Sequence, residues 1–254
     1  NMISNEVFID SATLRENVVA LARNIGYVPR SKKSSRTNLN FFVDISDVSP
    51  TPANLTLKAG PVATTGGQFN NQSFVFGIPE DLTVSVIDGV ANFDDVEVYE
   101  GSYLSQTYVY STRNKFQKFI LPNVGIDLDS LVVTVRPSID SSVTTKYSRQ
   151  DELFDSVTKS TINKNSNIYF IQEVESEQYE VIFGDGVFGK ALEDGNVIEM
   201  TYIVTNGSDG NGINSFTFSG SLSYVRNSVE IFVTNGISLI SSVLPSSGGE
   251  SIES

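Results

Sequence analysis

The chain has 254 residues, a formal net charge of −13 at pH 7, and no Cys, His or Trp. The missing residue types exclude disulfides, Ser-His-Asp triads, thiol nucleophiles and thiolate zinc sites. The acidic charge disfavours binding to phosphate backbones. No apolar run is long enough to span a bilayer, and the first residues lack the pattern of a signal peptide.

An amphipathic helix is predicted near the N-terminus. Thr13 and Glu16 have the spacing of a capping box, and Gly26 followed by Pro29 ends the helix. The partner of its apolar face is either the core of the same chain or another chain. The candidate face consists of residues spaced four, three and four apart, namely Leu14, Val18, Leu21 and Ile25.

A basic segment follows the predicted helix. Residues 30–36 contain four of the 17 Lys and Arg residues of the chain. One interpretation is an arm that binds phosphate or an acidic partner, and the other is a solvated linker. We favour the linker because no aromatic residue lies between the charges, as a single-strand nucleic-acid site would require.

From Leu39 onward, alternating apolar and polar residues predict short strands separated by turns. Asp88-Gly89 and Asn235-Gly236 have the composition of two-residue hairpin turns. The pattern indicates a mainly β fold, a β-rich α+β class, with antiparallel sandwich- or barrel-like domains and one N-terminal helix. The expected strands span 39–44, 55–59, 74–76, 82–87, 96–100, 108–110, 116–121, 131–135, 168–171, 179–183, 216–218, 229–233 and 237–240.

A polar, weakly patterned stretch between Pro137 and Asn167 is interpreted as a domain boundary. The expected division is an N-terminal helix with basic linker, a first β domain, a second β domain, and a tail that leads to a further C-terminal region of a longer protein. The corresponding residues are 1–38, 39–140, 141–245 and 246–254.

Carboxylates are the remaining candidates for chemistry. The neighbouring pairs Asp94-Asp95, Asp127 with Asp129, and Asp151-Glu152 could serve a metal or a glycosidase, but 30 acidic residues place such pairs together by chance. Asn206 begins a weak calcium-loop pattern that lacks the required Glu at position twelve, so a turn is the better interpretation. We expect no catalytic, cofactor-binding or metal-binding residues, and therefore no enzyme and no cofactor.

The most distinctive stretch is glycine-bearing and follows a predicted strand. It lacks the spacing of phosphate-binding glycine motifs, and no helix pattern follows it. We expect its glycines to adopt positive φ in consecutive turns and two of its phenylalanines, 183 and 188, to pack on one core face. Whether it is a subunit contact or an intramolecular corner stays open. The candidate motif comprises Phe183, Gly184, Asp185, Gly186, Val187, Phe188, Gly189 and Lys190.

These residues form part of a wider signature. Further parts of it are Gly195-Asn196, Thr205-Asn206-Gly207 and Gly210-Asn211-Gly212, together with motifs at both ends of the chain, Phe8 to Thr13, Gly26 to Ser31 and Gly248 to Glu253. With these motifs the chain resembles the baseplate-J-like family of contractile-tailed bacteriophages, and more closely the wedge proteins of T-even-like phages. Between Leu39 and Pro137 the resemblance is limited to β-rich character.

The resemblance implies a virion structural protein of the tail baseplate, assembled in the bacterial host cytoplasm. It would link wedges around the hub and take part in the rearrangement that triggers sheath contraction. Its implied partners are itself, as a homodimer or ring in the full-length protein, and other baseplate wedge proteins, with no nucleic acid, membrane or small-molecule substrate. The alternatives are a carbohydrate- or receptor-binding β module of a phage tail and a carboxylate glycosidase, both disfavoured by the absence of Trp.

Overall fold

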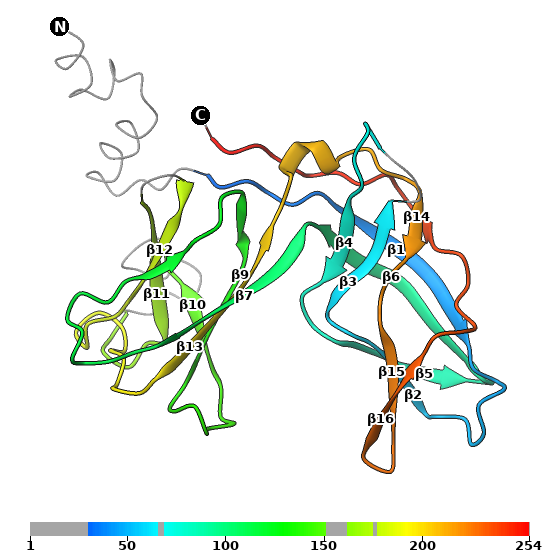
Figure 1. Cartoon of the computed structure of the whole chain (residues 1–254), viewed down its shortest axis with the longest axis horizontal. Coiled ribbons are helices and arrows are strands. Elements are labelled where there is room, and N and C mark those ends of the chain that lie inside the picture. The colour runs from blue at the N-terminus through cyan, green and yellow to red at the C-terminus, as the bar shows by residue number, and fades with distance from the viewer. Residues whose placement is uncertain (1–29, 66–68, 151–161, 175–176, 254) are drawn as a thin grey trace, which may run out of the picture. The chain divides into compact units, whose positions relative to one another are not determined.

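A computed structural model describes residues 30–65, 69–150, 162–174 and 177–253 of the chain (Figure 1). The prediction of a mainly β fold with antiparallel sheets is confirmed, whereas the predicted helix around Leu14–Ile25 lies outside the described residues. No helix in the described part is long and apolar enough to cross a membrane. The strands are β1 Arg36–Asp44, β2 Asn54–Leu57, β3 Gly60–Thr65, β4 Val75–Ile78, β5 Leu82–Ile87, β6 Val90–Glu100, β7 Ser102–Val109, β8 Phe119–Leu121, β9 Ile126–Arg136, β10 Thr145–Arg149, β11 Ile168–Glu173, β12 Tyr179–Phe183, β13 Val197–Val204, β14 Phe216–Phe218, β15 Leu222–Arg226, β16 Val229–Val233 and β17 Ser241–Ser242.

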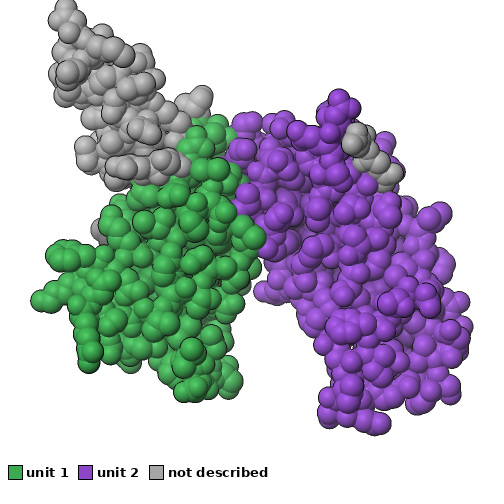
Figure 2. Space-filling model, in the orientation of Figure 1, with its two compact units in different colours: residues 1–31, 104–202, 252–254 green, residues 32–103, 203–251 purple. Residues whose placement is uncertain are grey.

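The chain divides into two compact units, which Figure 2 shows in green and purple. Unit 1 contains residues 1–31, 104–202 and 252–254, and unit 2 contains residues 32–103 and 203–251. Each unit is therefore discontinuous in sequence, whereas the sequence-based division into 39–140 and 141–245 assumes continuous segments. A linear scan for composition changes does not detect such interleaving, because the chain passes between the units inside two regular strands, β7 and β13.

Unit 2 is built on a large sheet whose two long strands, β1 and β6, pair antiparallel along most of their length (Figure 1). The alternating burial of β1 places Leu39, Phe41 and Val43 in the core. The rings of Phe41 and Phe93 stack across the pair with centroids 4.8 Å apart. Cross-strand aromatic pairs of this kind fix the register that keeps the apolar faces inside.

Unit 1 contains a seven-stranded sheet in the order β7-β13-β9-β10-β11-β12-β8. In this sheet β9 pairs antiparallel with β10, and β12 pairs antiparallel with β11 and β8, whereas β10 and β11 pair in parallel. In the core of this unit, Phe119 and Tyr147 approach Phe183 nearly edge-on, with centroids 5.4 and 5.5 Å from it. Phe183, the last residue of β12, is thereby anchored at the base of the glycine-bearing stretch.

Most expected strands are present, and two of the missed ones, β3 and β15, have identifiable causes. β3 contains Pro61, which discouraged a strand prediction, and the register of its pairing with β4 shifts between Pro61 and Ala63. β15 was missed because its hairpin turn is Asn227-Ser228, which has φ values of 50° and 63° but no glycine. The strand expected at 237–240 is wrong, since regular pairing there is confined to Ser241–Ser242.

Candidate functional site

The glycine-bearing stretch folds into a tightly bonded loop, residues 184–190, called here the tip loop. The Asp185 carboxylate accepts hydrogen bonds from the backbone N–H groups of Val187 and Phe188, each 2.9 Å long. These donors, that of Phe188 foremost, hold the pKa of the Asp185 carboxyl below its ordinary value of 3.8. The ionised form of Asp185 therefore stabilises the turn.

Further backbone bonds fix the tip loop to a neighbouring turn of unit 1. The Gly189 N–H donates to the carbonyl of Asn163 at 3.1 Å, and the Lys190 N–H donates to the carbonyl of Ser166 at 2.8 Å. Gly186 and Gly189 have φ values of +87° and +83°, which confirms the prediction of positive φ for these two glycines, whereas Gly184 has no positive φ. A loop bonded at both its tip and its base needs little further ordering when it binds a partner.

Phe183 and Phe188 do not share a core face, so that prediction is wrong. Phe183 packs on Phe119 and Tyr147, whereas Phe188 remains 51% exposed and Val187 66% exposed. The two turns reverse the chain after β12 and direct the second phenylalanine outward. Two adjacent apolar side chains held in solvent by a fixed loop have the character of an interface anchor.

A second site is buried in unit 2, where Glu100 ends β6 with only 1% of its surface exposed. Its Oε2 accepts hydrogen bonds from the Thr205 hydroxyl at 2.5 Å and the Asn206 N–H at 3.1 Å, and its Oε1 accepts one from Asn206 Nδ2 at 2.7 Å. A Cβ on Gly210 would lie 2.9 Å from Glu100 Cγ, so the loop after Asn206 needs glycine there. We call this arrangement the Glu100 junction.

The segment 246–250 is part of the same junction, and Figure 1 shows it in red beside the 3-10 turn Gly207–Gly210. On one side its Ser247 exchanges two backbone hydrogen bonds with Arg36, both 2.9 Å. On the other side Gly249 exchanges two with the Asn211 side chain, at 2.9 and 3.0 Å. The segment expected to be a tail is therefore bonded into unit 2 as far as Glu250.

The basic segment 30–36 is structured rather than a solvated linker. Lys33 and Glu250 exchange backbone hydrogen bonds of 3.0 and 3.1 Å, and the Ser35 carbonyl accepts the Glu100 N–H at 2.7 Å. The Arg36 guanidinium lies 3.3 Å from the exposed Glu97 carboxylate. The backbone of the basic segment therefore pairs with the C-terminal segment 246–250. A count of charges does not reveal this role.

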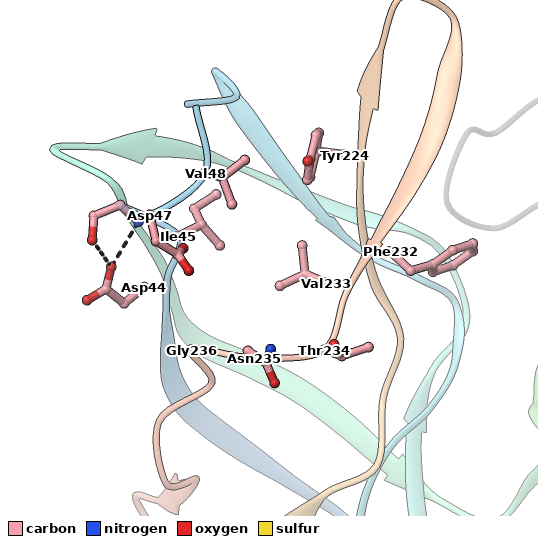
Figure 3. Close-up of a pocket in the computed structure, with 11 residues that line it drawn as sticks. Asp44, Ile45, Asp47, Val48, Tyr224, Phe232, Val233, Thr234, Asn235 and Gly236 are labelled. Atoms are coloured by element: carbon pink, nitrogen blue, oxygen red, sulfur yellow. Dashed lines mark hydrogen bonds between the residues drawn. The ribbon is translucent and has the colours of Figure 1, made fainter. Parts of the chain in front are cut away.

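A pocket of about 400 Å³ opens at one end of unit 2, between the loop 44–48 and the residues that follow β16 (Figure 3). Two carboxylates, Asp44 and Asp47, lie on one side of it. The Ser46 N–H and hydroxyl donate to Asp44 at 3.0 and 2.7 Å and hold the pKa of that carboxyl below 3.8. The apolar lining comes from Ile45, Val48, Tyr224, Phe232 and Val233.

The structure assigns packing roles to part of the candidate carboxylates. The Asp95 carboxylate accepts a hydrogen bond from Asn38 Nδ2 at 2.7 Å, close to the register shift between β1 and β6, and the Asp127 carboxylate accepts the Asp129 N–H at 3.0 Å. Asp151-Glu152 lies outside the described residues. Among those described, no group of three or more carboxylates is placed to hold a metal ion. Asn206 binds Glu100, in agreement with the turn interpretation.

Sequence reasoning missed Glu100 and the pocket. Glu100 precedes a glycine at the end of a strand, and no sequence pattern distinguishes such a buried glutamate from an exposed glutamate. Its hydrogen-bond partners, Thr205 and Asn206, are about a hundred residues away in sequence. The pocket joins residues near 45 and near 233, which are still farther apart in sequence. Only the pairing of strands brings these residues together.

Comparison with known proteins gives one distant relative. The chain is 22% identical over 239 residues to baseplate wedge protein gp6 of Enterobacteria phage T4. The similarity is distant but extends over 87% of the chain. It covers 33% of the phage T4 protein, so the chain spans about one third of the length of this relative. The baseplate wedge part of the resemblance is thus supported, while no family model matches the chain.

Replacing Asp185 by Ala should loosen the tip loop without unfolding unit 1. Two amides lose their acceptor, so hydrogen exchange at Val187 and Phe188 should accelerate roughly threefold to tenfold at pH 7. In the wild type the lowered folded pKa keeps this stabilisation complete above pH 3.8, and it is lost only as the pH falls through that lowered value. Amide exchange measured by NMR tests this. Exposed Asp140→Ala is the control, and unchanged rates in Asp185→Ala would contradict the account.

Replacing Glu100 by Gln should destabilise unit 2. The amide nitrogen of Gln cannot accept a hydrogen bond, so at least one donor, on the buried Thr205 or on Asn206, loses its partner. We expect a loss of about 2–3 kcal/mol in the free energy of unfolding, measured by urea denaturation at pH 7. Glu97→Gln, on the same strand but exposed, is the matched control and should cost less than about 1 kcal/mol. Equal effects of the two substitutions would refute the role of Glu100.

Proposed function

We propose that this protein is a structural component of a phage tail baseplate wedge. The observation that carries the proposal is the similarity to a baseplate wedge protein, which extends over 87% of the chain. We further propose that the protein links wedges around the hub and takes part in the rearrangement that triggers sheath contraction. Its location would be the tail baseplate of the virion, after assembly in the cytoplasm of the bacterial host.

The architecture supports a mechanical role. The Glu100 junction bonds the segments near residues 35, 206 and 249 into one unit, and the tip loop is fixed to the turn at 163–166. A protein that transmits force between neighbours requires elements of this kind, because flexible connections would absorb the displacement. We propose no catalysis and no cofactor, since the chain contains neither His nor Cys.

The proposed partners are other copies of the protein and other baseplate wedge proteins. The exposed Val187 and Phe188 of the tip loop are the residues that we propose for such a contact. Nucleic acids, membranes and small-molecule substrates are not proposed as partners, because the chain carries a net charge of −13 and lacks long apolar runs.

Immunogold labelling of the source phage with antibodies against the purified chain tests the proposed location. We expect gold at the end of the tail distal to the head in intact particles. Antibodies depleted on the purified chain serve as the control and should leave the particles unlabelled. Labelling of the capsid, or of no part of the particle, would contradict the proposal, and tight binding on a glycan array would favour the carbohydrate-binding alternative.

A further inference from the structure

The tip loop and the pocket are complementary in chemical character. The tip loop presents Val187 and Phe188, which are 66% and 51% exposed, at the end of a bonded turn. The pocket offers about 400 Å³, a size within the range of ligand pockets in other proteins, and its polar lining is interrupted by the apolar side chains of Val48, Tyr224 and Val233. Each feature leaves apolar surface in water that contact with the other would bury.

Their charges are also complementary. Lys190 ends the tip loop, and Lys164 lies in the turn that is bonded to it. Both lysines are exposed, and neither forms an ion pair within the described part of the chain. The pocket carries Asp44 and Asp47 on one side, likewise with no ion pair between either carboxylate and a described residue.

Charged groups that are close to each feature are already engaged. The Asp185 carboxylate of the tip loop is already bonded to the backbone N–H groups of Val187 and Phe188. Beside the pocket, Arg226 lies 5.3 Å from the centroid of the Tyr224 ring and donates to the Pro50 carbonyl. It is not ion-paired with the aspartates, so these remain available to an incoming ammonium group.

We propose that the tip loop of one copy inserts into this pocket of a second copy. Phe188 and Val187 enter between Val48, Tyr224 and Val233, while Lys190 approaches the aspartates. The occupied pocket and the inserted loop are different surfaces, so the contact is heterologous and repeats from copy to copy. When the rotation from each copy to the next closes on itself, the repeated contact forms a ring. The inference therefore rests on the proposed function and names one contact between copies within it.

Site-directed disulfide cross-linking tests the contact, because the chain contains no cysteine of its own. A Thr234→Cys copy places a thiol at the pocket lining, and a Val187→Cys copy places one at the tip loop while retaining Phe188 and Lys190. The two variants are mixed and mildly oxidised, and the yield of the disulfide between them is measured. In the control pair, a copy with the exposed Ser105→Cys replaces the Val187→Cys copy. The first pair should give at least fivefold more of the disulfide between copies than the control pair. Equal yields would overturn the proposal.

Charge reversal distinguishes a specific contact from a loss of folding. Asp47→Lys in the pocket copy, or Lys190→Glu in the tip copy, should each reduce the cross-linking yield severalfold, and the two together should restore it. Restoration cannot arise from unfolding, and circular dichroism confirms that each variant is folded. Reduced yields without restoration would overturn the proposed orientation.

The outcome is separable from that of the proposed function. Cross-linking uses the purified chain, whereas the location in the tail is tested on phage particles. Gold at the baseplate with control-level cross-linking would reject the contact alone. Strong cross-linking in a protein that is absent from tails would reject the baseplate role alone.

Discussion

One buried carboxylate connects the start, the middle and the end of unit 2. Glu100 lies at the end of the longest pairing in the unit, that of β1 with β6, and its side chain accepts three hydrogen bonds from Thr205 and Asn206. A carboxylate that is 1% exposed is costly to bury unless its oxygens are bonded, so the loop after β13 must stay in place. That loop in turn supplies Asn211, which binds the backbone of Gly249.

The junction also gives a physical meaning to several residues that carried the family resemblance. Thr205 and Asn206 are the ligands of Glu100. A Cβ on Gly207 would lie 2.7 Å from the Glu250 carbonyl, and one on Gly249 would lie 2.3 Å from the Gly207 carbonyl. These glycines permit three backbone segments to approach one another, and any side chain there would force them apart. This part of the signature thus records a packing arrangement.

The fold class was predictable from the sequence, because alternation and turn residues are local signals. The positive φ angles of Gly186 and Gly189 were predictable for the same reason. The outward position of Phe188 was not, because it depends on how the loop is bonded to Asn163 and Ser166. The two interleaved units could not be predicted either, since they depend on pairings between residues far apart in sequence, such as Leu57 with Leu222 and Leu39 with Ser242.

The tip loop and the pocket belong to different units, and each is well formed within its own unit. Their arrangement is consistent with a scaffold whose copies or neighbours join through fixed features instead of disordered arms. The net charge of −13 opposes indiscriminate association between copies. Specific contacts therefore need local positive charge, which the tip loop has in Lys190 and its supporting turn has in Lys164.

Native-state hydrogen exchange tests the central claim most directly, namely that the Glu100 junction makes unit 2 one cooperative structure. The informative amides are those of Arg36, Asn206 and Glu250, which donate to Ser247, Glu100 and Lys33. We predict that they exchange through the same global opening as core amides of β6 such as Val98, with the same dependence on denaturant. Exchange of the Arg36 and Glu250 amides by local fraying, orders of magnitude faster than the core, would contradict the account.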